Sequence, residues 1–260
     1  MKNSLYIFLL LASFSVKAQD DIVKKIVDEA TNNSQLEILA HELLDVVGPR
    51  LTGTPQMKNA GEWALQRYAG WGIDARIHEF GEWRGWERGV THIDLIYPRV
   101  RTLSGMQLAY SPSTSQKGIT AELAVIPEVN NKEEFTAWLK TIQGKFVLSS
   151  MNQVTGRPEY NWEKFATPES FEKMKKDKIE ASRKWNANYR KMGVNRRNII
   201  KTLEEAGAAG ILSSNWAGGF GANRIFSAGT KKIPNIDLRL EDYSMLYRMV
   251  KNGAGPEIRV

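Results

Sequence analysis

The chain has 260 residues, 42% of them hydrophobic, and its 36 Lys and Arg against 29 Asp and Glu give a formal net charge of +7. It contains no cysteine, which excludes disulfides, a cysteine nucleophile and lipid attachment to an N-terminal cysteine. A chain of this length and hydrophobic content can bury an adequate core, and two compact units are expected rather than one.

Residues 1–18 predict an export signal. Lys2 supplies the short positive start, an apolar run extends over residues 5–16, and a cleavage pattern ends at Ala18. The apolar run is about 12 residues, well short of the ~20 that span a bilayer. We therefore expect cleavage before Gln19, export to the periplasm or the medium, and no stable membrane span.

Residues 19–90 predict three helices. The segments 20–30 and 34–47 have the spacing of helices, and the apolar stripe of the second is ended by Gly48 and Pro49. The third helix is expected over 54–70, with one apolar face.

The loop between the second and third helices combines several special residues. Arg50 is left at the mouth of the turn, and Gly53 allows a backbone conformation or a close approach that a side chain would forbid. Thr54 followed by Pro55 is typical of an N-cap with proline at the first helical position. Considered alone, the pattern also fits an ordinary helix-loop-helix connection.

From Asp74 to Val90 the pattern changes to alternation, which predicts a strand running into the sequence GEWRGWERG. Trp83 and Trp86 in that sequence could form an aromatic platform for a substrate or a partner. The alternative is that these tryptophans cover an exposed edge of the core.

Residues 91–260 predict a β-rich domain with several helices. Strands are expected at 93–97, 106–110, 119–126, 145–149, 211–213, 233–238 and 257–260, and helices at 132–139, 198–205 and 241–251.

A charged insert at about 155–201 interrupts this domain. Between Arg157 and Lys201 there are 13 Lys and Arg against 6 Asp and Glu. Such an excess could attract nucleic acid or an anionic membrane, but the mixed signs at three- and four-residue spacing favour a solvated helical face. We therefore expect no nucleic-acid partner.

The run LLDVVGPRLTGT, with its flanking helices, resembles the N-terminal segment of the secreted two-zinc exopeptidases of clan MH, the aminopeptidase and carboxypeptidase Q-like group. The matching residues are Gly48, Pro49, Arg50, Leu51, Thr52, Gly53, Thr54, Ala60, Trp63 and Gly72. The turn AGAAG at 206–210, followed by the strand 233–238, resembles the protease-associated domain that is inserted into the same enzymes. The resemblance implies α/β plus β-rich architecture: the opening helices and first strand of the exopeptidase fold, then the inserted β-rich domain over 91–260, with the catalytic sheet largely absent.

The resemblance implies two zinc ions for the family, held by His and carboxylate ligands that follow the inserted domain. This chain offers only His41, His78 and His92. His92 and Asp94 have the H-x-D form, but no ligand loop follows them, so we expect none of the three to bind zinc. The pair Glu204 and Glu205 is interpreted as a solvated face. No catalytic nucleophile, phosphate loop or dinucleotide fingerprint is present either.

These observations lead to one hypothesis and two alternatives. The chain is predicted to be the non-metal-binding N-terminal portion of an exported zinc exopeptidase, which acts on peptides together with a missing zinc-binding half. In it, Arg50, Gly53 and Thr54 would shape the floor near the site, and Trp83 and Trp86 could meet substrate. One alternative is a stand-alone, non-catalytic module that binds peptides or proteins. The other is a basic protein that binds nucleic acid or the envelope surface, an alternative supported only by the charge of the insert.

Overall fold

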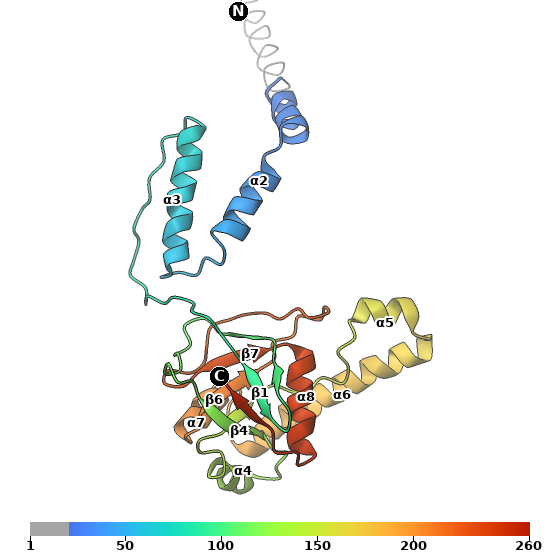
Figure 1. Cartoon of the computed structure of the whole chain (residues 1–260). Coiled ribbons are helices and arrows are strands. Elements are labelled where there is room, and N and C mark those ends of the chain that lie inside the picture. Colours follow the sequence, from blue (N-terminus) through green and yellow to red (C-terminus); the bar gives the residue numbers. More distant parts are fainter. Residues whose placement is uncertain (1–20) are drawn as a thin grey trace, which may run out of the picture. The chain divides into compact units, whose positions relative to one another are not determined.

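The computed structural model describes residues 21–260, so the predicted export signal at 1–18 lies outside the described residues. The chain divides into two compact units, one ending at Trp86 and the other spanning Glu87–Val260 (Figure 1). Within residues 21–260, no helix combines the length and the apolar character that crossing a membrane requires.

The first unit is helical, as the sequence predicts. A helix covers residues 21–32, and the second predicted helix is present as α2 (Leu36–Ala40) continued by the π-helix η1 (His41–Val46). Gly48 follows with a φ of +79°, the left-handed conformation expected of a glycine that ends a helix. The two helical segments therefore stop where the Gly-Pro pair predicted.

The third helix of this unit is α3 (Pro55–Gly70). The Thr54 hydroxyl oxygen accepts a hydrogen bond from the Met57 amide at 3.2 Å, which confirms the predicted N-cap. Thr54 is also buried, and its hydroxyl donates to the Leu51 carbonyl at 2.7 Å. Thr54 thus fixes both the start of α3 and the loop that precedes it.

The strand predicted over 74–90 is not formed, and this prediction of a first strand was wrong. Residues 73–93 contain neither helix nor strand. Alternation of side chains describes an extended backbone, but a strand also needs a neighbouring strand to receive its hydrogen bonds. Ile77 lies against Gly61 of α3, whereas Phe80 remains 93% exposed.

The second unit is built on one mixed sheet of eight strands. Its order is β2-β1-β8-β4-β5-β6-β7-β3. The strands are β1 (Asp94–Tyr97), β2 (Arg101–Thr102), β3 (Gly105–Gln107), β4 (Thr120–Val125), β5 (Phe146–Leu148), β6 (Gly210–Ser213), β7 (Asn235–Leu238) and β8 (Glu257–Arg259). The neighbours from β4 to β7 are parallel, and the pairs outside them are antiparallel.

The sheet is curled, which brings its two sides close together. A Cβ added to Gly105 in edge strand β3 would lie 2.6 Å from the Ile93 side chain, next to β1 on the other side of the sheet. The Leu103 amide also donates to the Ile93 carbonyl at 2.8 Å. Glycine at 105 therefore permits a contact between backbone and side chain that closes the curl.

The parallel strands bury side chains on both faces. Phe146 and Leu148 pack with Tyr243 and Leu246 of α8 (Leu240–Lys251) in one core cluster. Val147, between them, faces a second cluster with side chains of helices on the opposite face. Those helices are α4 (Lys132–Leu139), α6 (Pro168–Met192) and α7 (Ile199–Glu205).

The charged insert forms a helical arm, with α5 (Glu159–Phe165) and the N-terminal part of α6 extending from the body of the unit (Figure 1). The C-terminal part of α6 is buried against the second core cluster through Tyr189 and Met192. Buried Asn188 donates to the Pro127 carbonyl at 2.8 Å and accepts from the Val129 amide at 3.0 Å. The solvated face predicted for the insert therefore describes only part of it.

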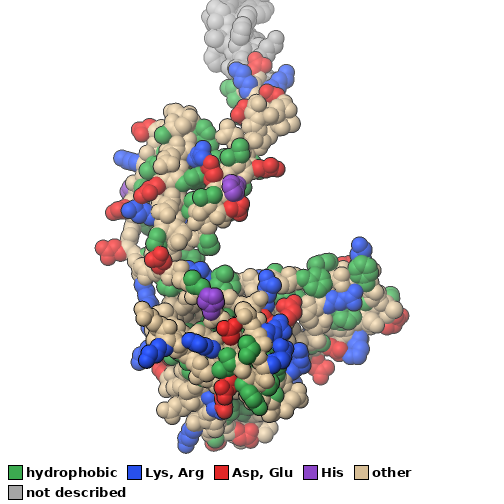
Figure 2. Space-filling view, in the orientation of Figure 1, with side chains coloured by type: hydrophobic (Ala, Val, Ile, Leu, Met, Phe, Trp, Pro, Cys, Tyr) green, Lys and Arg blue, Asp and Glu red, His purple; other side chains and the backbone are tan. Residues whose placement is uncertain are grey.

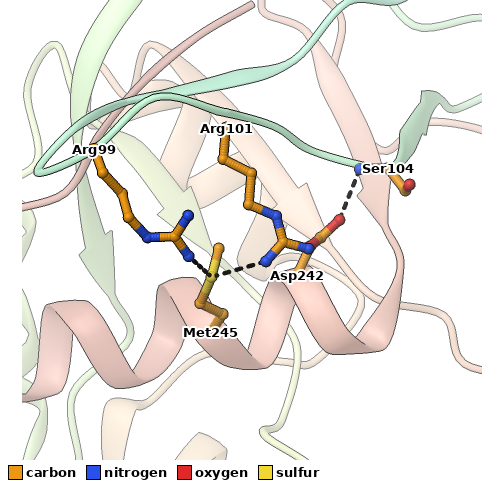
Figure 3. Close-up of polar contacts among 5 residues, drawn as sticks. All are labelled: Arg99, Arg101, Ser104, Asp242 and Met245. Atoms are coloured by element: carbon orange, nitrogen blue, oxygen red, sulfur yellow. Dashed lines mark hydrogen bonds and ion pairs between the residues drawn. The ribbon is translucent and has the colours of Figure 1, made fainter.

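Asp242, in the first turn of α8, fixes β2 and the segment between β2 and β3 to that helix (Figure 3). Its carboxylate accepts from Arg101 at 2.7 Å and from the Ser104 amide at 2.7 Å. Arg99 and Arg101 both reach the sulfur of Met245 at 3.5 Å. The Asp242 side chain is only 5% exposed, so these donors take the place of water.

We expect Asp242→Ala to lower the free energy of unfolding by about 1.5–3 kcal/mol, because it removes the hydrogen bonds that the Ser104 amide and Arg101 donate to a buried carboxylate. Urea unfolding followed by circular dichroism measures this. Asp177→Asn is the matched control, since it removes only the exposed pair of Asp177 with Lys173, worth less than about 0.5 kcal/mol. Equal effects of the two variants would contradict a structural role for Asp242.

Candidate functional site

Arg50 caps the helix that precedes it. Its guanidinium donates to the Leu43 carbonyl at 2.5 Å and to the Gly48 carbonyl at 2.7 Å. These carbonyls belong to the end of η1 and the turn after it, where a cation also interacts favourably with the helix dipole. The guanidinium is thereby held at the helix end.

Gly53 lies against the segment that carries the two tryptophans. A Cβ at Gly53 would lie 2.4 Å from the Arg84 carbonyl oxygen and 3.1 Å from a ring carbon of Trp83. The Trp86 amide donates to the Gly53 carbonyl at 3.2 Å. The structure therefore brings Gly53, Trp83 and Trp86 together, and Thr54 follows directly in the chain.

The two tryptophans differ in exposure. Trp83 is 65% exposed, whereas Trp86 is half-buried. Beside the Gly53 loop, Trp83 therefore presents an accessible aromatic ring, which suits contact with a ligand or with another protein segment.

Glu42 joins the two helices that flank this loop, a role that was not anticipated from the sequence. Its carboxylate accepts from the Trp63 indole at 2.8 Å and also from Arg67. The hydrogen bond from Trp63 and the charge of Arg67 lower the pKa of Glu42. Trp63 and Arg67 are four residues apart on one face of α3, whereas Glu42 lies on η1, so no local spacing in the sequence links it to them.

The histidines form no metal site within residues 21–260. His41 contacts Asp45 at 2.9 Å on an exposed helical face, and no cluster of three or more His, Cys, Asp or Glu side chains occurs in that range. His92 and Asp94 line a cavity of about 410 Å³ that also contains Arg259. A guanidinium beside them opposes cation binding, so the described residues do not fit a two-zinc centre.

A second cavity of about 410 Å³ lies at the carboxyl ends of β5 and β6, and we call it the strand-end pocket. Its floor contains polar residues that follow or end these strands: Ser149, Ser150, Ser213, Ser214 and Asn215. Residues of α6, of the segment leading into α7 and of the start of α7 also line the pocket, together with Phe226, Ser227 and Gly229. The carboxyl edge of parallel strands is a common location for ligand sites.

Beneath this floor lies Asp237, which is 1% exposed. Its carboxylate accepts a hydrogen bond from the Ser213 hydroxyl at 2.9 Å. It also accepts from the backbone amide and the side-chain amide of Asn215 and from the side-chain amide of Asn223. Burial raises the pKa of Asp237, and these hydrogen bonds offset part of that rise. No local pattern in the sequence indicates this cluster, because its members lie on β6, β7 and the loop between them.

Two sequence relatives and one solved structure to which this chain is similar are peptidases. No model of a known protein family matches it. Human carboxypeptidase Q is 25% identical over 237 residues, which cover 90% of this chain and 43% of the human protein. Bovine carboxypeptidase Q is 33% identical over 110 residues, which cover 41% of this chain and 23% of the bovine protein. The chain is homologous to carboxypeptidase Q.

A peptidase M28 precursor from Shewanella amazonensis has the same fold over the region compared. Its crystal structure matches with a TM-score of 0.51 and 20% sequence identity, covering 92% of this chain and 50% of that one. The chain thus spans less than half the length of the carboxypeptidase Q relatives and matches half of the solved M28 chain.

Gly53→Ala should disrupt the contact between the loop and the tryptophan segment, because the added Cβ meets the Arg84 carbonyl. We expect loss of hydrogen-exchange protection at the Trp86 amide. Gly48→Ala is the matched control, because Gly48 has a φ of +79°, close to the +78° of Gly53, but a Cβ at Gly48 would have no atom within 4 Å. This variant therefore carries only the backbone strain of an alanine at positive φ, roughly 1 kcal/mol. Unchanged protection of the Trp86 amide in Gly53→Ala would contradict the close approach.

Asp237 should make its own contribution to the pH dependence of stability. Because its folded pKa is raised, this contribution is fully present below the ordinary carboxyl value and is lost as pH rises through the folded pKa. The free energy of unfolding of the wild type minus that of Asp237→Asn should therefore fall across the pH range above the ordinary carboxyl pKa of about 4. Urea unfolding across this range tests the sign, and a difference that grows with pH would refute it.

Proposed function

We propose that this chain is the N-terminal, non-metal-binding portion of an exported, zinc-dependent exopeptidase, an aminopeptidase or carboxypeptidase Q-like enzyme that hydrolyses peptides. The observation that carries the proposal is the similarity to human carboxypeptidase Q, which extends over 90% of this chain but only 43% of the human protein.

The surface of the first unit supports this proposal. Thr54 is buried there, but no hydrophobic side chain within residues 21–86 is. Apolar residues are instead exposed along the helices, as the green side chains on this unit illustrate (Figure 2): Ile22, Val23, Ile26, Val27, Leu36, Ile38, Leu44 and Val46. Helices with uncovered apolar faces are expected to pack on further structure, here the zinc-binding half.

Within this proposal, the loop of Arg50, Gly53 and Thr54 shapes the floor near the substrate, and Trp83 and Trp86 contact the peptide. The exposed ring of Trp83 beside Gly53 supports that role. No catalytic step is assigned to residues of this chain, and export rests on the signal predicted at 1–18.

The alternative function is a non-catalytic module of protease-associated type that binds a peptide or protein. Two features of the second unit favour it: a core cluster on each face of the sheet and a pocket at the carboxyl ends of the strands. These features would let residues 87–260 bind without any contribution from a metal centre.

The mass of the native polypeptide separates the two functions. An antibody raised against this chain should detect, in the envelope or medium of the source cells, a protein of roughly twice the chain's 29.4 kDa. Peptidase activity should copurify with that protein and be lost on removal of zinc with a chelator. A native mass slightly below 29.4 kDa, without peptidase activity, would overturn the proposal in favour of the binding module.

A further inference from the structure

We propose that the strand-end pocket binds the C-terminal residue of a peptide, with the terminal carboxylate on Arg196 and an apolar side chain against the aromatic wall. The inference deepens the peptide-binding function proposed as the alternative above and requires no hydrolysis. It also gives a role to the charged insert, whose helix α6 forms one wall of the pocket.

The lining of the strand-end pocket carries a positive charge. Arg196 is the only charged side chain among the described residues that line the strand-end pocket. It is exposed, and it takes part in none of the ion pairs found among residues 21–260. Asp237 does not line the pocket, and its carboxylate already receives hydrogen bonds from Ser213, Asn215 and Asn223. A guanidinium without a partner suits a carboxylate, whereas nothing in this lining would neutralise a ligand ammonium group.

One buried hydroxyl of the pocket lining makes no hydrogen bond within the described residues. Ser214 is 8% exposed and lines the pocket, yet its Oγ has no hydrogen-bond partner in the described structure. The neighbouring floor serines are already engaged: Ser149 donates to the Leu212 carbonyl, and Ser150 accepts from the Ser214 amide. Buried hydroxyls are normally satisfied, so an unpaired one at a pocket wall indicates a polar group of a ligand.

Part of the pocket lining is aromatic and aliphatic. Trp185 and Tyr189 of α6 line the pocket in a T-shaped pair with ring centroids 5.5 Å apart, and Phe226 and Ile200 also line it. A volume of about 410 Å³ accommodates one large side chain and the adjoining backbone. Aromatic and aliphatic walls beside one cation and a free hydroxyl match an apolar residue that ends in a carboxylate.

The test is calorimetric titration of the full chain with N-acetylphenylalanine, which mimics a C-terminal residue. The corresponding amide and free phenylalanine serve as comparison ligands. We expect saturable binding of N-acetylphenylalanine, with the amide at least about fivefold weaker because it lacks the charge recognised by Arg196. Free phenylalanine should also bind more weakly; tighter binding of free phenylalanine would overturn the peptide assignment in favour of an amino-acid site.

Variants localise the binding. Arg196→Gln should weaken binding of N-acetylphenylalanine at least about fivefold, whereas Arg197→Gln, the adjacent exposed arginine outside the pocket lining, should leave it unchanged. Ser214→Ala should weaken binding without lowering the melting temperature, because it removes an unpaired hydroxyl.

Absence of binding at about 10 mM ligand, equal binding of the amide, or equal effects of Arg196→Gln and Arg197→Gln would each overturn the inference. None of these results bears on the native mass or on zinc-dependent hydrolysis, so failure here is distinguishable from failure of the proposed enzyme.

Discussion

The second unit depends on burial of its parallel strands from both sides. Phe146, Val147 and Leu148 alternate in direction, yet all three are fully buried. Such a strand is stable only if both faces of the sheet are covered, which α8 does on one side and α4, α6 and α7 do on the other. The same parallel arrangement aligns the ends of β5 and β6, and so gathers serines from distant parts of the chain into one pocket floor.

The first unit lacks this constraint, and its contacts are correspondingly polar. Glu42 joins η1 to α3 through Trp63 and Arg67, Arg50 caps the end of η1, and Thr54 caps α3. These hydrogen bonds define the local path of the chain, but each contributes only about 1 kcal/mol net. Because the unit has no buried apolar core within residues 21–86, these polar contacts leave the apolar faces of its helices exposed.

Local patterns predicted most of the helices and strands. The helix at 132–139 is observed with the expected bounds as α4, where Asn131 caps the first turn by accepting from the Glu134 amide at 2.9 Å. The strand expected over 74–90 failed because its pattern specifies side-chain directions but not a pairing partner. Helix signals are contained within one segment, whereas a strand requires a second segment that the sequence pattern does not identify.

In the candidate sites, too, contacts between residues distant in the sequence could not be predicted. Gly53, Trp83 and Trp86 could be selected from the sequence because each belongs to an unusual local run, although their mutual contact could not. The Asp237 cluster and the strand-end pocket carried no local signal, since Ser149, Ser214 and Arg196 become neighbours only when the sheet forms.

The charged insert illustrates why composition alone misjudges such a segment. Its mixed charges are those of a solvated helix, and the exposed pair of Lys173 and Asp177 fits that description. Further along the same helix, Asn188, Tyr189 and Met192 are buried. A single helix of 25 residues is long enough to leave the unit at one end and to complete its core at the other. Its wall of the strand-end pocket lies toward the buried end, where Trp185 and Tyr189 supply aromatic side chains, and Arg196 just beyond the helix supplies the charge.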